Sequence, residues 1–492
     1  MISFTVSMML LVIGYFFYGR IVERVFGIKP NRKTPVHLRQ DGVDYIPLPG
    51  WRIFLIQFLN IAGLGPIFGA IMGAKFGTSA YLWIVFGCIF AGSAHDFFSG
   101  MLSLRHHGES YPEIIGRYMG KPFMQFVRIF SSVMMILVGA VFVVGPAGLL
   151  TKLTQNSLGL SFYVWVAIIF VYFIAATLLP IDKLIGRLYP IFGASLLFMA
   201  VGILVCLYLH MPDLPEFTDG LMNTHPKAET TPIFPMLFIT IACGAISGFH
   251  ATQSPMMARC MTNEKQGRPI FFGSMIVEGI VALIWAAAAN YAFNTPEGRA
   301  FFTSSNAALV VNYVSQNWLG TVGGALAVLG VVAAPITSGD TAFRSARLIV
   351  ADALRIDQKN LMKRLLVSLP LFVAGLLLLF IDFSIVWRYF AWTNQILATI
   401  TLWAVTIYLT LRRRNFWFML IPAIFMTAVV TAYFVMAPET LGLSTEIAFP
   451  LTLVTTGIVL FLYIRWNRSF NRRFPVNRHL QHQDVKSNRE FS

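Results

Sequence analysis

Thr337 and Ser338 stand next to each other inside a long apolar stretch of the chain. Hydroxyl oxygens, together with backbone carbonyls released from helical hydrogen bonding, are the hard ligands that small cations prefer. The pair could therefore help to hold a sodium ion. In the alternative interpretation, both hydroxyls hydrogen-bond to carbonyls of their own helix, which is common for Ser and Thr in membranes.

Five ionisable side chains lie within apolar stretches or at their ends, where we expect proton coupling or gating. Glu278 stands in the middle of an apolar run, so it must be paired, protonated or in contact with water. We expect Glu278 to titrate; the alternative is a neutral acid that hydrogen-bonds to a neighbouring helix. His95 and Asp96 lie deep in another run and need partners. Asp340 and Arg344 are spaced i, i+4, which favours an ion pair with a gating or structural role and leaves a proton relay open.

Glycine interrupts two of the apolar stretches at their centres, at residues 60–66 (NIAGLGP) and 242–250 (ACGAISGFH). A membrane helix that unwinds exposes backbone groups that only protein or a water-filled cavity can satisfy. Two such breaks in corresponding halves of a chain point to a transporter's binding site, and half-helix N-termini favour a substrate carboxylate. The expected substrate-binding residues lie at these breaks and in a later polar stretch: Gln57, Asn60, Gly63, Gly65, Gly244, Gly248, His250, Asn394 and Gln395.

The composition predicts an integral membrane protein. Hydrophobic residues make up 57% of the 492 positions and charged residues only 12%, with a mean hydropathy of +0.69, whereas globular chains carry about a quarter charged residues. The first apolar stretch lacks a basic leader and a small-residue cleavage site, so we interpret it as a retained span. About twenty apolar residues cross a bilayer as a helix, which predicts thirteen spans at 2–18, 52–74, 79–103, 122–150, 161–180, 188–210, 232–257, 269–293, 319–341, 364–381, 383–411, 415–436 and 448–465.

The placement of charge predicts the topology. Most of the 37 Lys and Arg residues lie in alternate loops and in the C-terminal tail, and the opposite loops are acidic or neutral. The positive-inside rule then places the N-terminus outside and the C-terminus inside. The excess of basic residues thus indicates membrane orientation and not nucleic-acid binding. The four cysteines, Cys88, Cys206, Cys243 and Cys260, show neither a disulfide framework nor metal-ligand spacing.

The two breaks lie five spans apart and enter the membrane from opposite sides, as a five-plus-five inverted repeat requires. We therefore predict an all-α membrane protein of about thirteen helices with a LeuT-like core. Its expected parts are a peripheral helix and cytoplasmic loop (1–51), the first repeat (52–210), an extracellular loop (211–231), the second repeat (232–411), two peripheral helices (412–465) and a basic cytoplasmic tail (466–492).

The LeuT-type fold places a Thr-Ser pair of its eighth core helix against carbonyls of its first broken helix to bind sodium. The stretch at 319–341 is the eighth of the ten predicted core spans. By this analogy, the sodium ligands are Thr337, Ser338 and Ala334 on that span and Ala62 and Gly65 at the first break.

Six strings carry a family resemblance: 41–45 (DGVDY), 61–66 (IAGLGP), 94–96 (AHD), 246–250 (ISGFH), 337–344 (TSGDTAFR) and 387–395 (WRYFAWTNQ). They resemble the carbon starvation protein A family of bacterial membrane proteins over roughly residues 1–465. The resemblance implies a transporter of the bacterial cytoplasmic membrane, induced on nutrient limitation, for peptide or pyruvate uptake, within the amino acid–polyamine–organocation superfamily. The family's larger members are much longer and resemble His-His-Phe at the start of the first broken helix, where Gln57 to Asn60 stand here. Imidazoles there could carry protons that these amides cannot.

These observations predict a carbon-starvation-type secondary active transporter that imports a small carboxylate-bearing nutrient by alternating access. The candidates are pyruvate, an amino acid or a short peptide, and the coupling ion is sodium or a proton. The alternatives are an uncoupled facilitator or channel, and a membrane nutrient sensor. We do not expect an enzyme, because neither a metal cluster nor a nucleophile–base pair is evident, and we expect no cofactor. The expected partners are the small-molecule substrate and the lipid bilayer, and no feature indicates an oligomeric state.

Overall fold

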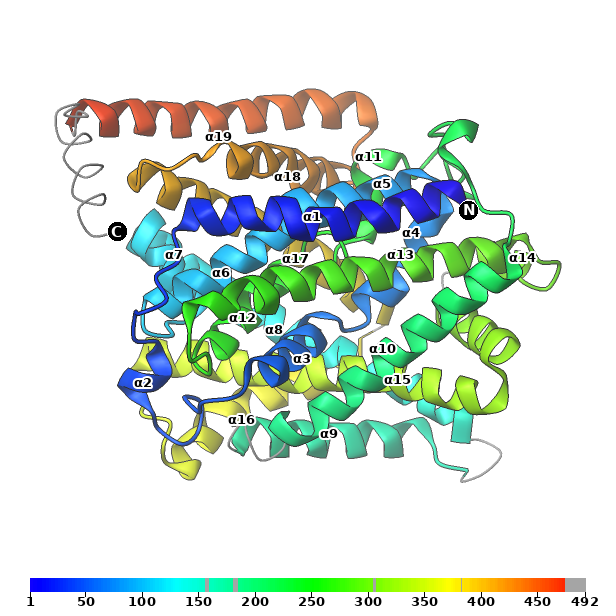
Figure 1. Cartoon of the computed structure of the whole chain (residues 1–492), viewed down its shortest axis with the longest axis horizontal. Coiled ribbons are helices and arrows are strands. Elements are labelled where there is room, and N and C mark those ends of the chain that lie inside the picture. Colours follow the sequence, from blue (N-terminus) through cyan, green and yellow to red (C-terminus); the bar gives the residue numbers. More distant parts are fainter. Residues whose placement is uncertain (155–158, 180–184, 304–306, 382, 474–492) are drawn as a thin grey trace. The chain divides into compact units, whose positions relative to one another are not determined.

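The structure, a computed structural model, describes residues 1–154, 159–179, 185–303, 307–381 and 383–473. Every regular element within these ranges is a helix, as Figure 1 shows. The chain divides into two units, residues 1–433 and residues 434–492.

The first half of the larger unit contains α1 (Ile2–Phe26), α2 (Pro35–Arg39), α3 (Gly50–Ile61), η1 (Gly65–Gly69), α4 (Ala70–Gly73), η2 (Ala74–Phe76), α5 (Ser79–Phe86), η3 (Gly87–Gly92), α6 (Ser93–Arg105), α7 (Tyr111–Met119), α8 (Lys121–Thr154), α9 (Phe162–Leu178) and α10 (Ile185–His210). The second half contains η4 (Phe217–Asp219), α11 (Ile233–Thr240), α12 (Gly248–Ala258), η5 (Glu264–Gln266), η6 (Arg268–Phe272), α13 (Gly273–Asn294), α14 (Arg299–Thr303), α15 (Ala307–Leu354), α16 (Leu361–Leu378) and α17 (Phe383–Leu411). α18 (Trp417–Met436) extends into the smaller unit, which contains α19 (Thr445–Arg473).

Nine of the described helices are long and apolar enough to cross a membrane. Gly50–Ile61 and Gly65–Phe76 form a bent pair, and the number of such spans rises to ten if this pair counts as one span. The predicted all-helical membrane fold is therefore confirmed. Each of the thirteen predicted stretches contains helix, but the number of crossings and the repeat boundaries at 52–210 and 232–411 remain predictions. The last part of the predicted tail, from residue 474, lies outside the described residues.

The first break lies between α3 and the π-helical η1. Helix α3 ends at Ile61, η1 begins at Gly65, and the two parts of the span meet at 55°. Pro66 occupies the start of η1, where its missing N–H would have no helical acceptor in any case. The sequence therefore both interrupts the helix and restarts it.

The second break lies between α11, which ends at Thr240, and α12, which begins at Gly248. Gly244 in the intervening segment has a φ of 93°, a left-handed conformation that glycine adopts without steric cost. Helix α12 packs against α6, α3 and α17, which lie around it in Figure 1. Protein thus surrounds the backbone at this break, as an unwound membrane helix requires.

Helix α15 carries the hydroxyl pair and is much longer than the predicted span at 319–341. It extends over 48 residues, with a bend at Gly320. It packs against α8, α10 and α9 and also contacts α3, the first half of the first broken span. This packing places the hydroxyl pair beside the first break.

Candidate functional site

The two breaks contact each other, although they are far apart in the sequence. A Cβ added at Gly65 would lie 2.1 Å from the Cβ of Cys243, so only glycine permits this approach. From the other side, a Cβ added at Gly244 would lie 3.7 Å from the Cα of Pro66. The unwound segments of the two spans therefore form one region at the centre of the helices.

A chain of buried ionisable groups runs beside this region. Asp96 lies between two histidines: its Oδ1 is 2.8 Å from His95 Nδ1, and its Oδ2 is 2.9 Å from His250 Nδ1. Glu278 Oε2 lies 3.5 Å from His250 Nε2. All four side chains are fully buried. The fold thus brings together His95, Asp96, His250 and Glu278 from α6, α12 and α13.

Three members of this chain have donor or acceptor atoms without a hydrogen-bond partner among the described residues. These atoms are His95 Nε2 and, facing each other, His250 Nε2 and the carboxylate oxygens of Glu278. The backbone of Gly244 approaches the Glu278 carboxylate but makes no hydrogen bond of ordinary geometry. Cys243 lies next to them, with its sulfur inside a group of candidate ligand atoms that are all within 4.8 Å of one another. The cluster of Cys243, His250 and Glu278 could not be predicted from the sequence, because its members come from an unwound segment and two helices without a regular spacing.

The two predicted amides on α17 bind the second break. Asn394 donates to Ser247 Oγ at 3.0 Å and accepts from the backbone N–H of Phe249 at 2.7 Å. Gln395 donates to a backbone carbonyl of the unwound segment at 3.1 Å. Gly248 lies directly against α17, since a Cβ there would be 2.4 Å from the carbonyl oxygen of Asn394. These amides stabilise the unwound conformation by replacing lost helical hydrogen bonds.

The two predicted amides on α3 differ from each other. Gln57 donates to Ser254 Oγ at 3.3 Å, whereas its carbonyl oxygen has no partner among the described residues. Asn60 is fully buried, and neither its amide nitrogen nor its oxygen has a partner there. A buried amide without hydrogen bonds costs free energy, and such a group in a native structure calls for an explanation. A ligand that supplies the missing hydrogen bonds would provide one.

The hydroxyl pair on α15 lies in a group of four oxygens. Ser338 Oγ donates to the carbonyl oxygens of Leu59 at 2.8 Å and Ala334 at 3.0 Å. Thr337 Oγ1 donates to the same carbonyl of Ala334 at 2.7 Å. Both interpretations of the pair therefore keep support: each hydroxyl bonds its own helix, and one also contacts the broken span.

The carbonyl of the broken span that Ser338 contacts is that of Leu59, three residues before the predicted ligand Ala62. Gly63 is the neighbour of Ser338 at the break itself, since a Cβ there would lie 3.2 Å from Ser338 Oγ. Gly65 instead lies against the second break. The oxygen group thus lies at the end of α3, one turn earlier than the sequence predicted.

The predicted ion pair between Asp340 and Arg344 is not formed. Asp340 accepts a hydrogen bond from the hydroxyl of Tyr189. Arg344 pairs with Asp44, whose Oδ1 lies 2.9 Å from Nη1, and Arg347 lies 3.4 Å from the same carboxylate. The spacing of i, i+4 permits a pair within α15, but the loop before α3 supplies a carboxylate that both arginines reach.

This loop carboxylate is held in its charged form. Burial alone would raise the pKa of Asp44. The positive charges of Arg347, Arg344 and Arg259 outweigh burial and lower this pKa to about 2. The ion pairs connect the loop before the first broken span to α15. They are therefore placed to couple movement of the broken span to that of its neighbours.

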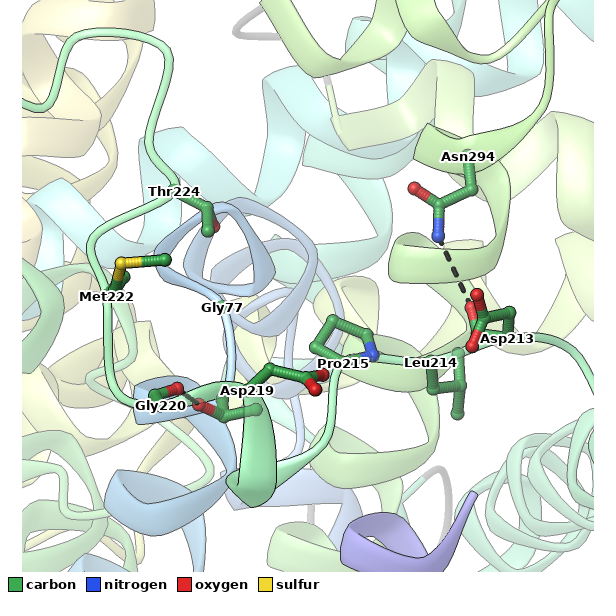
Figure 2. A pocket seen from close by; sticks show the side chains of 10 residues that line it. Gly77, Asp213, Leu214, Pro215, Asp219, Gly220, Met222, Thr224 and Asn294 are labelled. Carbon is green, nitrogen blue, oxygen red and sulfur yellow. Dashed lines mark hydrogen bonds between the residues drawn. The ribbon is translucent and has the colours of Figure 1, made fainter.

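Cavities lie near both ends of the helices in the larger unit. One, of about 280 Å³, is formed by loops and includes Asp213, Asp219 and Asn294, which Figure 2 shows at close range. None of the predicted site residues lines it. A second cavity, of about 760 Å³, is lined by Arg259 and charged residues, and a narrow third cavity shares Arg259 and reaches Thr252 on α12.

Comparison with known proteins identifies the family. The sequence profile of the family described as carbon starvation protein CstA matches residues 1–158, 144–318 and 286–433. The chain belongs to this family. An uncharacterized membrane protein of Haemophilus influenzae is 43% identical over 367 residues, which cover 64% of this chain and 99% of that protein. The expected family resemblance is thus confirmed.

Two relatives within the family have names that describe transport. Peptide transporter CstA of Campylobacter jejuni is 30% identical over 332 residues, covering 55% of this chain and 47% of the relative. Pyruvate/proton symporter BtsT of Escherichia coli is 27% identical over 371 residues, covering 61% of this chain and 51% of the relative. The chain spans about half the length of these curated transporters.

A solved structure has the same fold. The crystal structure of MhsT in complex with L-phenylalanine superposes with a TM-score of 0.57 and 12% sequence identity, covering 86% of this chain and 98% of that chain. The likeness shows the fold alone. It confirms the prediction of a LeuT-like arrangement that was made from the two opposed breaks.

Proposed function

We propose that this CstA-family chain is a secondary active transporter that imports a small carboxylate-bearing nutrient by alternating access. Pyruvate, an amino acid and a short peptide are the candidate substrates. The observation that carries the proposal is the contact between the two breaks at Gly65 and Cys243. Unwound segments that meet inside the protein offer backbone groups to a substrate where no lipid reaches them.

The ends of the half-helices support a carboxylate substrate. Helix α12 points its N-terminus into the unwound segment, where the helix dipole favours an anion beside the N–H that Asn394 already accepts. Asn60, on the last turn of α3, has a buried amide whose donor and acceptor atoms lack partners among the described residues. We assign the substrate carboxylate to the N-terminus of α12 and a polar group of the substrate to Asn60.

Two cavities support a path to this site from one end of the helices. The cavity of about 760 Å³ contains Arg259 in its wall, and the narrow cavity that shares Arg259 extends to Thr252. Thr252 lies within α12, one turn beyond its N-terminus. Alternating access would open this path by moving the arginine and the Asp44 loop away from α15.

We propose sodium as the coupling ion. The hydroxyls of Thr337 and Ser338 on α15 lie within hydrogen-bonding distance of the carbonyl oxygens of Ala334 and Leu59. Leu59 belongs to the C-terminal end of α3, where the helix dipole favours a cation. The name of the relative BtsT includes a proton as the coupled ion, so the proton is the ion against which sodium must be tested.

We further propose the bacterial cytoplasmic membrane as the location, with the N-terminus outside and the C-terminus inside. The loops that join the helices alternate between basic and acidic or neutral composition, which supports this orientation. In this orientation the Asp44 loop and Arg259 lie on the cytoplasmic side. The path described above would then release substrate into the cell.

The test is uptake of labelled pyruvate, alanine and a dipeptide into proteoliposomes with an imposed sodium or proton gradient. We expect one of these substrates to accumulate above its external concentration when sodium is directed inward. Accumulation driven only by the proton gradient would overturn the choice of sodium. Equilibration that ignores both gradients would replace the secondary transporter with a facilitator, and no uptake of any substrate would favour a nutrient sensor.

A further inference from the structure

Cys243, His250 and Glu278 form a compact buried cluster whose sulfur, ring nitrogen and carboxylate have no role in the path and sites proposed above. Their candidate ligand atoms all lie within 4.8 Å of one another, and all three side chains are buried. A thiolate sulfur, an imidazole nitrogen and a carboxylate oxygen are the three donor types that Zn²⁺ binds in proteins. The donor set thus matches a borderline-soft divalent ion better than sodium, which prefers oxygen.

The distances fit a shared ion. His250 Nε2 and Glu278 Oε2 are 3.5 Å apart, and two such ligands on a tetrahedral zinc ion lie about 3.4 Å apart, given bond lengths of about 2.0–2.2 Å. Cys243 lies in unwound backbone next to Gly244, and its sulfur lies within 4.8 Å of the other two ligand atoms. Neither His250 Nε2 nor the Glu278 oxygens have hydrogen-bond partners among the described residues. Two of the three ligands thus have free donor or acceptor atoms, and Cys243 Sγ would exchange a long contact of 3.5 Å with Ser247 Oγ for the ion.

The surroundings of His250 also match a metal ligand. Its Nδ1 lies 2.9 Å from Asp96 Oδ2, and a metal-binding histidine almost always donates its second ring N–H to a carboxylate, a carbonyl or water. The other oxygen of Asp96 is held by His95 at 2.8 Å. This arrangement fixes the ring so that Nε2 faces Glu278 and Cys243.

The charges of the cluster call for a cation. Within the described part of the chain, the ion-pair partners of Asp96 and Glu278 are histidines, with neither Lys nor Arg among them. Burying an ionised carboxylate without a compensating charge is strongly unfavourable. A divalent ion at the three ligand atoms would offset two negative charges of this region and connect the second unwound segment to α12 and α13.

We propose that Cys243 Sγ, His250 Nε2 and the Glu278 carboxylate bind a Zn²⁺ ion, with Asp96 and His95 as positioning residues for His250. Binding converts the Cys243 thiol to a thiolate, and the displaced proton leaves to the solvent. Three protein ligands leave a fourth tetrahedral position for water or for an oxygen of a bound carboxylate. The site goes beyond the proposed function, and its occupancy can be measured without transport.

The test uses the full chain, purified in detergent and stripped of metal with a chelator, and titrated with Co²⁺ as the spectroscopic probe. We expect about one Co²⁺ per chain, a thiolate-to-cobalt charge-transfer band, and displacement of Co²⁺ by Zn²⁺. Asp96→Asn should keep the band and weaken binding of Co²⁺ by about 10- to 100-fold. Cys243→Ser should lose the band and weaken binding of Co²⁺ by more than Asp96→Asn does. Absence of stoichiometric binding by the unmodified chain would overturn the proposal.

Cys88→Ser is the matched control, because Cys88 is another buried cysteine, packed against α13 at Gly279. It should bind Co²⁺ and show the band as the unmodified chain does. Equal binding by Cys243→Ser and Cys88→Ser would refute the assignment of the sulfur ligand. If Cys243→Ser does not fold, zinc-edge absorption of the unmodified chain decides: one sulfur at about 2.3 Å supports the site, and a shell of oxygen and nitrogen alone refutes it.

Discussion

Replacement of Asp44 by asparagine tests the ion pairs that connect the loop before α3 to α15. Asp44 is 4% exposed and lies 2.9 Å from Arg344 Nη1 and 3.4 Å from Arg347 Nη2. Its pKa falls from the ordinary 3.8 to about 2 because the arginines outweigh the effect of burial. Such a shift corresponds to about 2 kcal/mol of stability at neutral pH.

The loss in Asp44→Asn should be larger than this value. Neutralising the carboxylate leaves two buried guanidinium groups without it, and removing one partner of a buried ion pair costs about 3–5 kcal/mol. We therefore expect the free energy of unfolding to fall by about 3–5 kcal/mol. The exposed Asp357 on the loop after α15 provides the control, since Asp357→Asn removes the same charge without a buried partner.

The assay is the apparent midpoint of thermal unfolding of purified protein in detergent at one fixed heating rate, because unfolding of such proteins is often irreversible. Asp44→Asn should unfold at a lower temperature than both the unmodified chain and Asp357→Asn. Removing a second charge should restore part of the loss, so that Asp44→Asn combined with Arg347→Met is less unstable than the sum of the single changes predicts.

The pH dependence provides a further readout of the same ion pairs. A carboxyl whose pKa is lowered by folding stabilises the folded state above its ordinary pKa, and this contribution is lost as the pH falls from about 4 to about 2. The unmodified chain should lose this increment of stability in that window, and Asp44→Asn should not. The reasoning fails if Asp44→Asn unfolds at the same temperature as Asp357→Asn, or if the double change is strictly additive.

Two further predictions concern the breaks. Thr337→Ala combined with Ser338→Ala should abolish the stimulation of uptake by sodium at unchanged protein abundance. Thr341→Ala, which removes a hydroxyl bonded to its own helix, should keep this stimulation. Full sodium stimulation in the double variant would contradict the oxygen site. Gly65→Ala should abolish gradient-driven uptake, because the added Cβ would collide with Cys243. Gly148→Ala should transport normally, because Gly148 has open space around it. Normal uptake by Gly65→Ala would show that the two breaks do not need to touch.

The fold could be predicted from the sequence because its signals are local. Apolar length predicts helices that cross a membrane, and glycine in the middle of an apolar stretch predicts a break. The two breaks at 60–66 and 242–250 are both present as unwound segments. Their opposed directions pointed to the fold that the likeness to MhsT confirms.

Much of the site could not be predicted, because its contacts join positions that are distant in the sequence. Arg344 pairs with Asp44, 300 residues away, while the sequence offered Asp340 one turn away on the same helix. Cys243 joins His250 and Glu278 only because the unwound segment turns its sulfur toward α13. A helical period describes which residues share a face of one helix, but it does not show which face of another helix they meet.

The central claim is that the two breaks form one substrate site, and Asn60 tests it most directly. The measurement is the ratio of internal to external labelled substrate in proteoliposomes under an inward sodium gradient, for the unmodified chain, Asn60→Ala and Asn290→Ala. Asn290 is also buried, but its amide already donates to Tyr81, so its loss controls for removal of a buried amide. We predict accumulation by the unmodified chain and Asn290→Ala, and a rise in KM of about 10-fold or more for Asn60→Ala, as loss of a hydrogen bond to substrate implies. Unchanged KM and accumulation in Asn60→Ala would contradict the account.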